Sequence, residues 1–249
     1  MTALAESLEK LEEAITQACR RVGRARHDVE LMAVSKTYPA STIAEASRLG
    51  LRVFGENRVQ EFAAKALELA PIRAEGSNAA SDAPILVHLI GHLQSNKAAR
   101  AVDLFDAIDS VDSMRLAERL NDALGKLHKR LPVLLEVKLS SEETKAGLDP
   151  ESAEATRLLE ALPGLHHLEV RGLMTIAPWG VAGDVTRACF RSLRTWRDRW
   201  TAEYPNLNLS ELSMGMSGDF PLAIEEGATR IRIGTALFGK RPPYTGPPE

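Results

Sequence analysis

Eight short apolar runs alternate with amphipathic helical stretches, and this alternation constrains the fold more than any other feature of the sequence. The runs that predict strands cover residues 30–35, 52–55, 85–90, 105–110, 133–139, 169–174, 208–214 and 230–234. The stretches that predict helices cover residues 41–49, 58–69, 113–129, 151–162, 184–200 and 220–226. Eight strand–helix units within about 220 residues predict an α/β chain folded as a single closed (β/α)8 TIM-type barrel. An open doubly wound sheet is the alternative, although such sheets usually have fewer strands.

Three segments do not fit the alternation. Residues 1–26 predict an extra helix packed on the barrel. Its apolar face consists of Leu4, Leu8, Leu11 and Ile15. Residues 73–84 are rich in alanine, serine and glycine, which predicts a flexible surface insertion, and the proline-rich residues 242–249 predict a disordered tail. We therefore expect the barrel domain over residues 1–241.

Charge and hydropathy exclude several classes of function. The formal net charge of -3 provides no attraction to nucleic acid or to anionic membranes. Charges occur throughout the first helix, so it does not resemble a signal peptide, and no segment reaches the roughly 18 apolar residues that a membrane-spanning helix needs. Cys19 and Cys189 lack the spacing of a redox or zinc motif. These features predict a soluble cytoplasmic protein, and we expect a monomer because no exposed apolar stripe requires a partner.

Lys36 directly follows the first predicted strand, and functional groups of parallel barrels gather where the strands end. Apolar walls would lower the pKa of such a lysine, because the charged form loses hydration, and a neutral amine is what Schiff-base chemistry requires. A lysine that extends to solvent and forms an ion pair is the alternative, and Lys36 alone favours that alternative.

Two loops after the seventh and eighth predicted strands change this balance, because these loops usually bind phosphate in barrels. Their hydroxyl and glycine residues are Ser213, Gly215, Ser217, Gly218, Gly234 and Thr235. Helices predicted to begin near Ser217 and Thr235 would direct free N–H groups at an anion. For either loop alone, ordinary capping remains an equal alternative, with Ser217 as an N-cap and Gly227 as a C-cap.

Seven ordered motifs connect Lys36 with these loops. They are Ala33-Val-Ser-Lys36, Phe54-Gly-Glu-Asn57-Arg-Val-Gln-Glu61, His88-Leu-Ile-Gly-His-Leu-Gln-Ser-Asn-Lys97, Asp109-Ser-Val-Asp112, Arg171-Gly-Leu-Met174, Ser213-Met-Gly-Met-Ser217 and Arg232-Ile-Gly-Thr235. The series resembles the pyridoxal phosphate homeostasis protein family, whose barrel is related to the N-terminal domain of alanine racemase. The resemblance covers residues 29–241.

This resemblance implies a role for each site residue. Lys36 would carry pyridoxal 5'-phosphate as a Schiff base, with Asn57 near the ring and Met174 lining the pocket. The phosphate would be held by Ser213, Ser217, Gly234 and Thr235. Arg232 would face the pyridine nitrogen, where a permanent positive charge disfavours ring protonation and restrains carbanion chemistry.

Two positions depart from the family pattern. Val87 stands where tryptophan is usual, and Lys138 stands where asparagine is common. Both affect details of the expected pocket, and neither alters Lys36 or the phosphate loops.

The resemblance implies a protein that buffers or delivers pyridoxal phosphate in vitamin B6 and amino-acid homeostasis without turnover of its own. Apo forms of pyridoxal-phosphate enzymes are the expected acceptors. The chain ends at the barrel, so we expect no second domain of the kind that supplies a tyrosine base in alanine racemase. A racemase or weak lyase is the alternative, with Tyr38 or His88 transferring the proton. A barrel without any cofactor is the third hypothesis.

Two further patterns have simpler explanations than a site. His88 and His92 have the spacing of a metal pair on a helix, but the β-like run before them favours a polar strand end. The predicted helix over residues 184–200 carries a row of arginines that could meet phosphates. Its members are Arg187, Arg191, Arg194 and Arg197. Because the chain is acidic overall, we expect a solvated helix face instead.

Overall fold

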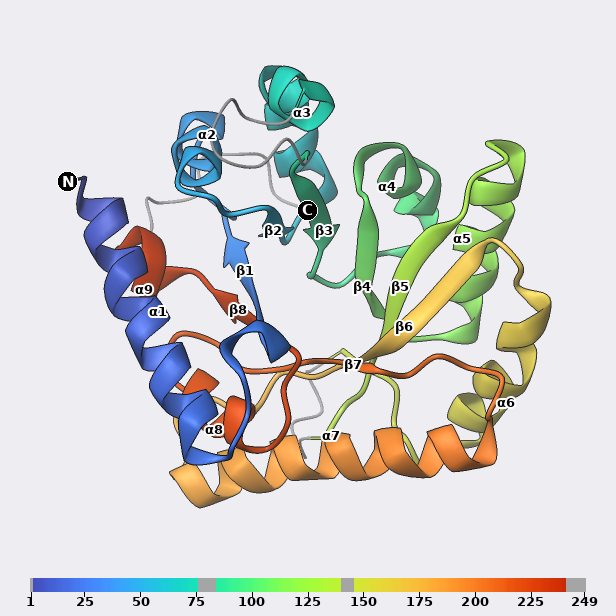
Figure 1. The fold of residues 1–249 in the computed structure, drawn as a ribbon. Helices are drawn as coiled ribbons and strands as arrows, with labels where there is room; N and C mark the ends of the chain where they lie inside the picture. Colours follow the sequence, from blue (N-terminus) through green and yellow to red (C-terminus); the bar gives the residue numbers. More distant parts are fainter. Residues whose placement is uncertain (1, 76–83, 140–145, 241–249) are drawn as a thin grey trace.

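Eight parallel strands close into a barrel in a computed structural model that describes residues 2–75, 84–139 and 146–240 (Figure 1). The strands are β1 (Glu30–Val34), β2 (Val53–Glu56), β3 (Leu86–Leu89), β4 (Ala107–Val111), β5 (Leu131–Glu136), β6 (Leu168–Met174), β7 (Glu211–Ser213) and β8 (Arg230–Ile233). Each strand pairs with the next in sequence, and β8 closes the barrel on β1 with Leu31 beside Ile231. The predicted (β/α)8 barrel is thus confirmed.

Helices surround the barrel between consecutive strands (Figure 1). They are α2 (Ala40–Arg48), α3 (Val59–Glu75), α4 (Ala98–Leu104), α5 (Met114–Lys126), α6 (Ala153–Ala161), α7 (Gly183–Glu203), α8 (Phe220–Glu225) and α9 (Thr235–Phe238), with 3-10 turns at Arg26–Asp28, Ser95–Lys97 and Leu162–Gly164. The short helix α4 was not predicted, because seven residues give too few turns to show a periodic apolar face. None of the described helices is long and apolar enough to cross a membrane.

The first helix, α1 (Ala3–Arg21), lies along the outside of the barrel next to α8 and α9 (Figure 1). Leu4, Leu11 and Ile15 are buried in this contact, and Thr2 caps the helix by accepting a hydrogen bond from the Ala5 amide. Arg24 then donates to the carbonyl oxygens of residues 224 and 228, which ties the segment after α1 to α8. The extra helix therefore covers the barrel between its last two helices.

Two of the irregular segments lie largely outside the described residues. Helix α3 continues to Glu75, so the prediction of an insertion that begins at Arg73 was wrong in its first residues. Arg73 is instead held in the helix by a pair of hydrogen bonds to Asp106. Residues 76–83 and the predicted tail at 242–249 lie outside the described residues.

The barrel has a conventional apolar layer outside the strands and a charged interior. Alternate strand residues such as Leu31 and Ile231 pack outward against the helices. The residues between them point inward, where Asp109 of β4 lies 3.5 Å from Arg230 of β8 and 3.0 Å from His88 of β3. Burial opposes ionisation of Asp109, but the charges of these two neighbours outweigh burial and lower its pKa. Paired polar and charged side chains therefore fill the barrel interior between the strands.

Candidate functional site

A cavity of about 550 Å³ opens at the C-terminal ends of the strands, where functional groups of parallel barrels gather. It brings together six of the eight predicted site residues, which are Lys36, Asn57, Ser217, Arg232, Gly234 and Thr235. The remaining two, Met174 and Ser213, are fully buried at the ends of β6 and β7 and are not among the residues that line this cavity. Residues about 200 positions apart in the sequence thus meet at one site.

Lys36 and Asn57 follow β1 and β2 directly, and their side chains lie together in the cavity. The ammonium nitrogen of Lys36 is 3.4 Å from the amide oxygen Oδ1 of Asn57. Gly91, after β3, lies against the backbone of Asn57, because a Cβ atom on Gly91 would lie 2.2 Å from the Asn57 carbonyl oxygen. Ser110 holds Gly91 from the other side by donating its hydroxyl to the Gly91 carbonyl at 2.7 Å. The position of Asn57 therefore depends on a glycine.

A buried ionic network fixes the two residues that flank Lys36. Lys65 of α3 donates to Glu56 at 3.0 Å, to Glu61 at 2.8 Å and to the carbonyl oxygen of Ser35 at 3.2 Å. The hydroxyl of Ser35 also donates to Glu56 at 2.7 Å. Burial raises the pKa of Glu56, and the charge of Lys65 opposes that shift. The backbone before Lys36 is thus tied to two acidic side chains through one ammonium group.

The residue after Lys36 has an unusual backbone conformation. Thr37 has a φ of 70°, in the left-handed region that non-glycine residues rarely adopt. Its amide donates a hydrogen bond to the carboxylate of Glu61, which links this turn to the same network. Glu56 and Glu61 belong to the same motif as Asn57, but the sequence predicted a site role for Asn57 alone. A four-residue spacing between Glu61 and Lys65 on a predicted helix was the available signal.

Arg232 is buried at the end of β8 with its guanidinium held in one orientation. Nη1 donates to the carbonyl oxygen of Ser213 at 2.6 Å and to its hydroxyl at 2.9 Å, and Nη2 donates to the carbonyl oxygen of Thr175 at 2.7 Å. Burial lowers the pKa of Arg232, although acidic groups including Asp109 and Glu136 oppose this shift. Ser213 therefore orients Arg232, whereas the resemblance implied that it contacts phosphate.

The loop after β7 is joined to the start of α9. Gly215 has a φ of 94°, and a Cβ atom there would lie 2.6 Å from the side chain of Ala223. The hydroxyl of Ser217 accepts a hydrogen bond from the Ala236 amide at 3.2 Å, so the two predicted phosphate loops touch each other. Gly218 faces open space, since a Cβ atom there would meet no other atom within 4 Å. Hydroxyl groups and backbone amides therefore surround a small open volume.

The predicted helix starts near these loops were partly right. Helix α9 begins at Thr235 as expected, but α8 begins at Phe220, and the residue before it is Asp219. Asp219 accepts the Met216 amide, which closes a turn over the residues where a helix start was predicted. The N-cap role proposed for Ser217 was therefore wrong. Gly227, with a φ of 102°, ends α8 just after its last residues, as the alternative explanation expected.

A second, smaller cavity of about 300 Å³ adjoins the first. The two share Lys36, Asn57, Ile90 and Ile176. Its remaining lining comes from the ends of β3 and β5 and from Ala146, and includes Glu136 and Lys138. Burial raises the pKa of Glu136 to about 7, with a further contribution from the negative charge of Asp112, while Arg232 and His92 oppose it. Sequence reasoning did not single out Glu136.

His92 follows the end of β3, as predicted, whereas His88 lies within β3 and is buried in the barrel interior. His88 lies 3.0 Å from Asp109 and His92 lies 3.0 Å from Asp112, each through Nδ1. Within the part of the chain that the structure describes, no group of three or more histidine, cysteine, aspartate or glutamate side chains could hold a metal ion. Asp109 lies within the next strand, β4, and Asp112 directly follows that strand.

The arginine row of α7 lies on the solvent-exposed side of the helix, as expected, and its members form ion pairs within the chain. Arg187 lies 2.5 Å from Glu225, and Arg191 lies 2.9 Å from Glu226. Arg194 lies 3.3 Å from the same Glu226. These contacts join α7 to the end of α8, which explains the row without nucleic acid or another phosphate ligand.

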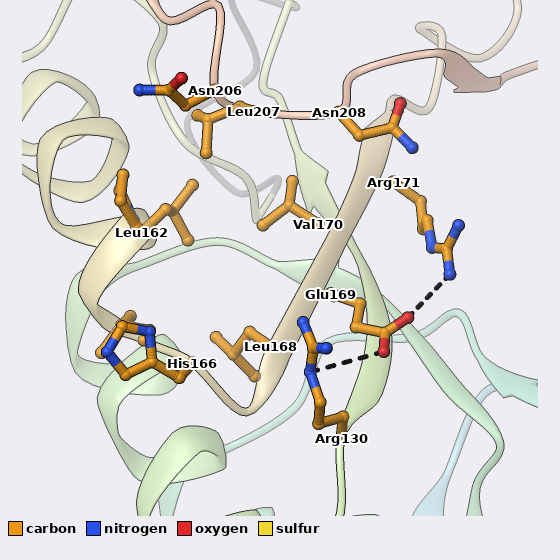
Figure 2. A pocket seen from close by; sticks show the side chains of 12 residues that line it. Arg130, Leu162, His166, Leu168, Glu169, Val170, Arg171, Asn206, Leu207 and Asn208 are labelled. Atoms are coloured by element: carbon orange, nitrogen blue, oxygen red, sulfur yellow. Dashed lines mark hydrogen bonds and ion pairs between the residues drawn. The ribbon is translucent and has the colours of Figure 1, made fainter.

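Another cavity, of about 750 Å³, lies among residues of the turn after α6, of β6 and of the segment before β7 (Figure 2). Its floor includes Leu168 and Val170, and Glu169 lies between two arginines at its edge. Glu169 is 2.7 Å from Arg171 and 3.5 Å from Arg130. This cavity includes none of the predicted site residues, and its charged groups already pair with one another.

The closed barrel, with a lysine at the end of β1 and hydroxyl-bearing loops after β7 and β8, defines a protein of the alanine racemase barrel class. The model of the family described as "Alanine racemase, N-terminal domain" matches residues 7–242. Within this class, the chain belongs to the pyridoxal phosphate homeostasis protein family, as its motifs predicted. It is 42% identical to the family member from Aquifex aeolicus over 95% of this chain and 97% of that one. The Escherichia coli K12 member is 38% identical over 97% of this chain and 98% of its own length.

Solved structures agree with this assignment. PipY of Synechococcus elongatus, determined with pyridoxal phosphate (PLP) bound, is 44% identical and has a TM-score of 0.80, covering 95% of this chain and 100% of PipY. Alanine racemase of Clostridium difficile is 16% identical, with a TM-score of 0.69 over 96% of this chain and 57% of that enzyme. This second likeness establishes a shared barrel fold.

Proposed function

We propose that this protein binds pyridoxal 5'-phosphate covalently through Nζ of Lys36 and buffers or delivers the cofactor. The observation that carries the proposal is the fixed position of Lys36, between a buried ionic network and a cavity edged by two hydroxyl-bearing loops. PipY, which is 44% identical and was solved with PLP, supports the same ligand. Relatives across nearly their full length bear the name pyridoxal phosphate homeostasis protein, which supports the carrier role.

The residues of the larger cavity fit the chemistry of this cofactor. An amine is present for its aldehyde, and hydroxyl groups of Ser217 and Thr235 and the backbone near Gly234 surround space for its phosphate. Asn57 would lie beside the ring, and Met174 would support the cavity wall from its buried position. A volume of about 550 Å³ is within the range of small-molecule sites. When bound, the cofactor supplies a reactive aldehyde and an electron-accepting ring.

Arg232 distinguishes a carrier from a catalyst in this site. Its three hydrogen bonds to Ser213 and Thr175 hold a permanent positive charge at the end of β8. A guanidinium facing the pyridine nitrogen would keep that nitrogen unprotonated, and an unprotonated ring is a weaker electron sink. The chain would therefore retain the cofactor while restraining its reactivity.

The two residues that the sequence suggested for proton transfer in an enzyme are occupied elsewhere. The hydroxyl of Tyr38 donates to the carbonyl oxygen of Gly239 at 2.8 Å, and its ring packs on Phe238. His88 is buried against Asp109. Neither residue is among those lining the two cavities that contain Lys36. This favours a carrier over the alternative, a PLP-dependent racemase or weak lyase.

Titration of the purified protein with PLP tests the proposal. We expect a visible absorption band in the wild type and none in Lys36→Ala. Incubation of the loaded protein with L-amino acids in deuterated water tests the alternative, since hydrogen exchange at Cα above the Lys36→Ala background would establish catalysis. We further propose a cytoplasmic monomer whose acceptors are apo forms of PLP-dependent enzymes. Transfer to such an apoenzyme at a rate above that of free PLP would support delivery.

A further inference from the structure

The smaller cavity is lined by Lys36 but by none of the residues of the predicted phosphate loops. Whereas the larger cavity is completed by residues after β7 and β8, the smaller one is completed by residues after β3 and β5. Its volume of about 300 Å³ corresponds to the smallest class of ligand sites. Both cavities reach Lys36, so a molecule in the smaller cavity would lie beside the lysine without occupying the phosphate loops.

Glu136, at the end of β5, provides an acceptor that has no donor among the described residues. The residue is 6% exposed and lines the cavity. Its Oε2 atom is fully buried and has no hydrogen-bond partner among the described residues. Buried carboxylate oxygens are nearly always paired, because an unpaired one loses its hydration without compensation. The arrangement indicates a ligand that brings a hydrogen-bond donor, and a cationic donor would compensate the charge as well.

Lys138 lines the same cavity two residues further along. Residues two apart in an extended segment share a face, so Glu136 and Lys138 lie on the same side of the chain. The segment remains extended past β5, because Val137 pairs with Leu148 and the Lys138 amide donates to the Leu148 carbonyl at 3.0 Å. Gly147, the residue before Leu148, lets the two segments approach this closely, since a Cβ atom on it would lie 2.9 Å from the backbone nitrogen of Lys138. One acidic and one basic group are therefore held at one edge of the cavity.

We infer that the smaller cavity is a subsite for an α-amino acid. The ammonium of such a ligand would donate to Glu136, and its carboxylate would meet the ammonium group of Lys138. Ile90, Ile176 and Leu139 provide apolar contacts for a short aliphatic side chain. The inference rests on the proposed function in one respect, because the amino group of the ligand would lie next to the lysine that holds the cofactor.

Binding of L-alanine to the cofactor-free protein tests this inference by isothermal titration calorimetry. Ethylamine and propionate each carry one of the two charged groups, so we expect each to bind at least tenfold more weakly than alanine. Glu136→Gln and Lys138→Asn should each weaken alanine binding about tenfold or more, the loss expected for one charge-assisted hydrogen bond. The exposed residues Glu118 and Lys126 supply matched controls, and Glu118→Gln and Lys126→Asn should bind alanine as the wild type does.

Three results would overturn the inference. They are no alanine binding by the wild type, propionate or ethylamine binding as tightly as alanine, and equal alanine affinity in Glu136→Gln and Glu118→Gln. PLP titration of the same variants separates this test from the proposed function. Cofactor binding without alanine binding would defeat the subsite and leave the carrier role standing. Alanine binding without cofactor binding would defeat the carrier role and leave the subsite standing.

Discussion

The backbone amide of Thr37 donates a hydrogen bond to the carboxylate of Glu61, one residue after the lysine at the end of β1. This contact holds a threonine at a φ of 70°, a conformation that costs about 1–2 kcal/mol for a residue with a side chain. Glu61 also accepts from Lys65, so the strained turn and the buried ion pair depend on the same carboxylate. Residues of α3 therefore fix the backbone turn that directly follows Lys36.

Glu61→Gln should reduce both stability and cofactor loading. The change removes the negative charge that faces Lys65, and we expect the free energy of unfolding to fall by about 2 kcal/mol. The turn at Thr37 should loosen, so a smaller fraction of the protein should carry PLP at a given concentration. Glu68→Gln, on the exposed face of the same helix, is the control for urea unfolding and for absorbance titration. Identical loading of the two variants would argue against a positioning role for Glu61.

Gly91→Ala should displace Asn57 from Lys36. A methyl group at residue 91 would lie 2.2 Å from the Asn57 carbonyl oxygen, so the backbone must shift. We expect a loss of about 1–3 kcal/mol in unfolding free energy, together with weaker PLP binding. Gly164→Ala is the matched control, because a Cβ atom there meets nothing within 4 Å. Wild-type PLP affinity in Gly91→Ala would show that Asn57 does not need its observed position.

Arg232→Ala should weaken cofactor retention. The truncation removes the charge at the end of β8 and leaves the carbonyl oxygens of Ser213 and Thr175 without their donor. Loss of a charge-assisted contact corresponds to roughly tenfold weaker binding. Dialysis of loaded protein measures this as remaining absorbance, with Arg48→Ala on the exposed face of α2 as the control. Equal retention by the two variants would contradict the proposed contact with the ring.

Glu136 should make stability depend on pH in a defined direction. Its pKa rises from 4.5 to about 7 on folding, so the folded chain binds this proton more tightly than the unfolded chain. Protonation of Glu136 therefore adds to the free energy of unfolding, and this stabilisation is fully present below pH 4.5 and is lost as the pH rises to about 7. It amounts to about 3 kcal/mol.

Glu136→Gln removes this titration, so the variant should gain stability relative to wild type between pH 5 and pH 8. Urea unfolding at the two pH values measures the difference. The groups that set the shift, Asp112, Arg232 and His92, are unchanged in the variant. A wild-type minus variant difference that is the same at both pH values would show that Glu136 does not titrate in this range.

The barrel and the gathering of Lys36 with the loops after β7 and β8 were predictable because both follow from periodicity and from the geometry of parallel strands. Strand ends converge at one face, so residues that follow a predicted strand can be placed together without coordinates. The alternation of outward and inward residues was equally visible along β8, where Ile231 and Ile233 alternate with the two arginines.

The partners of those inward residues were not predictable. That Arg232 is held by Ser213 depends on the register of two neighbouring strands, and that Asp109 of β4 meets Arg230 of β8 depends on which strands face each other across the barrel. Glu136 was overlooked for a related reason, since a carboxylate at a strand end gives no sign in the sequence that its oxygen has no donor among the described residues. Cross-barrel contacts require the closed geometry, and sequence pattern alone does not provide it.

Borohydride reduction of the PLP-treated protein, followed by peptide mass spectrometry, tests the central claim most directly, because reduction makes the bond between lysine and cofactor permanent. We predict the added mass of the cofactor on the peptide containing Lys36, and its disappearance in Lys36→Ala with an unchanged circular dichroism spectrum. Cofactor mass on Lys65 or Lys138 with none on Lys36, or no modified lysine at all, would contradict the account.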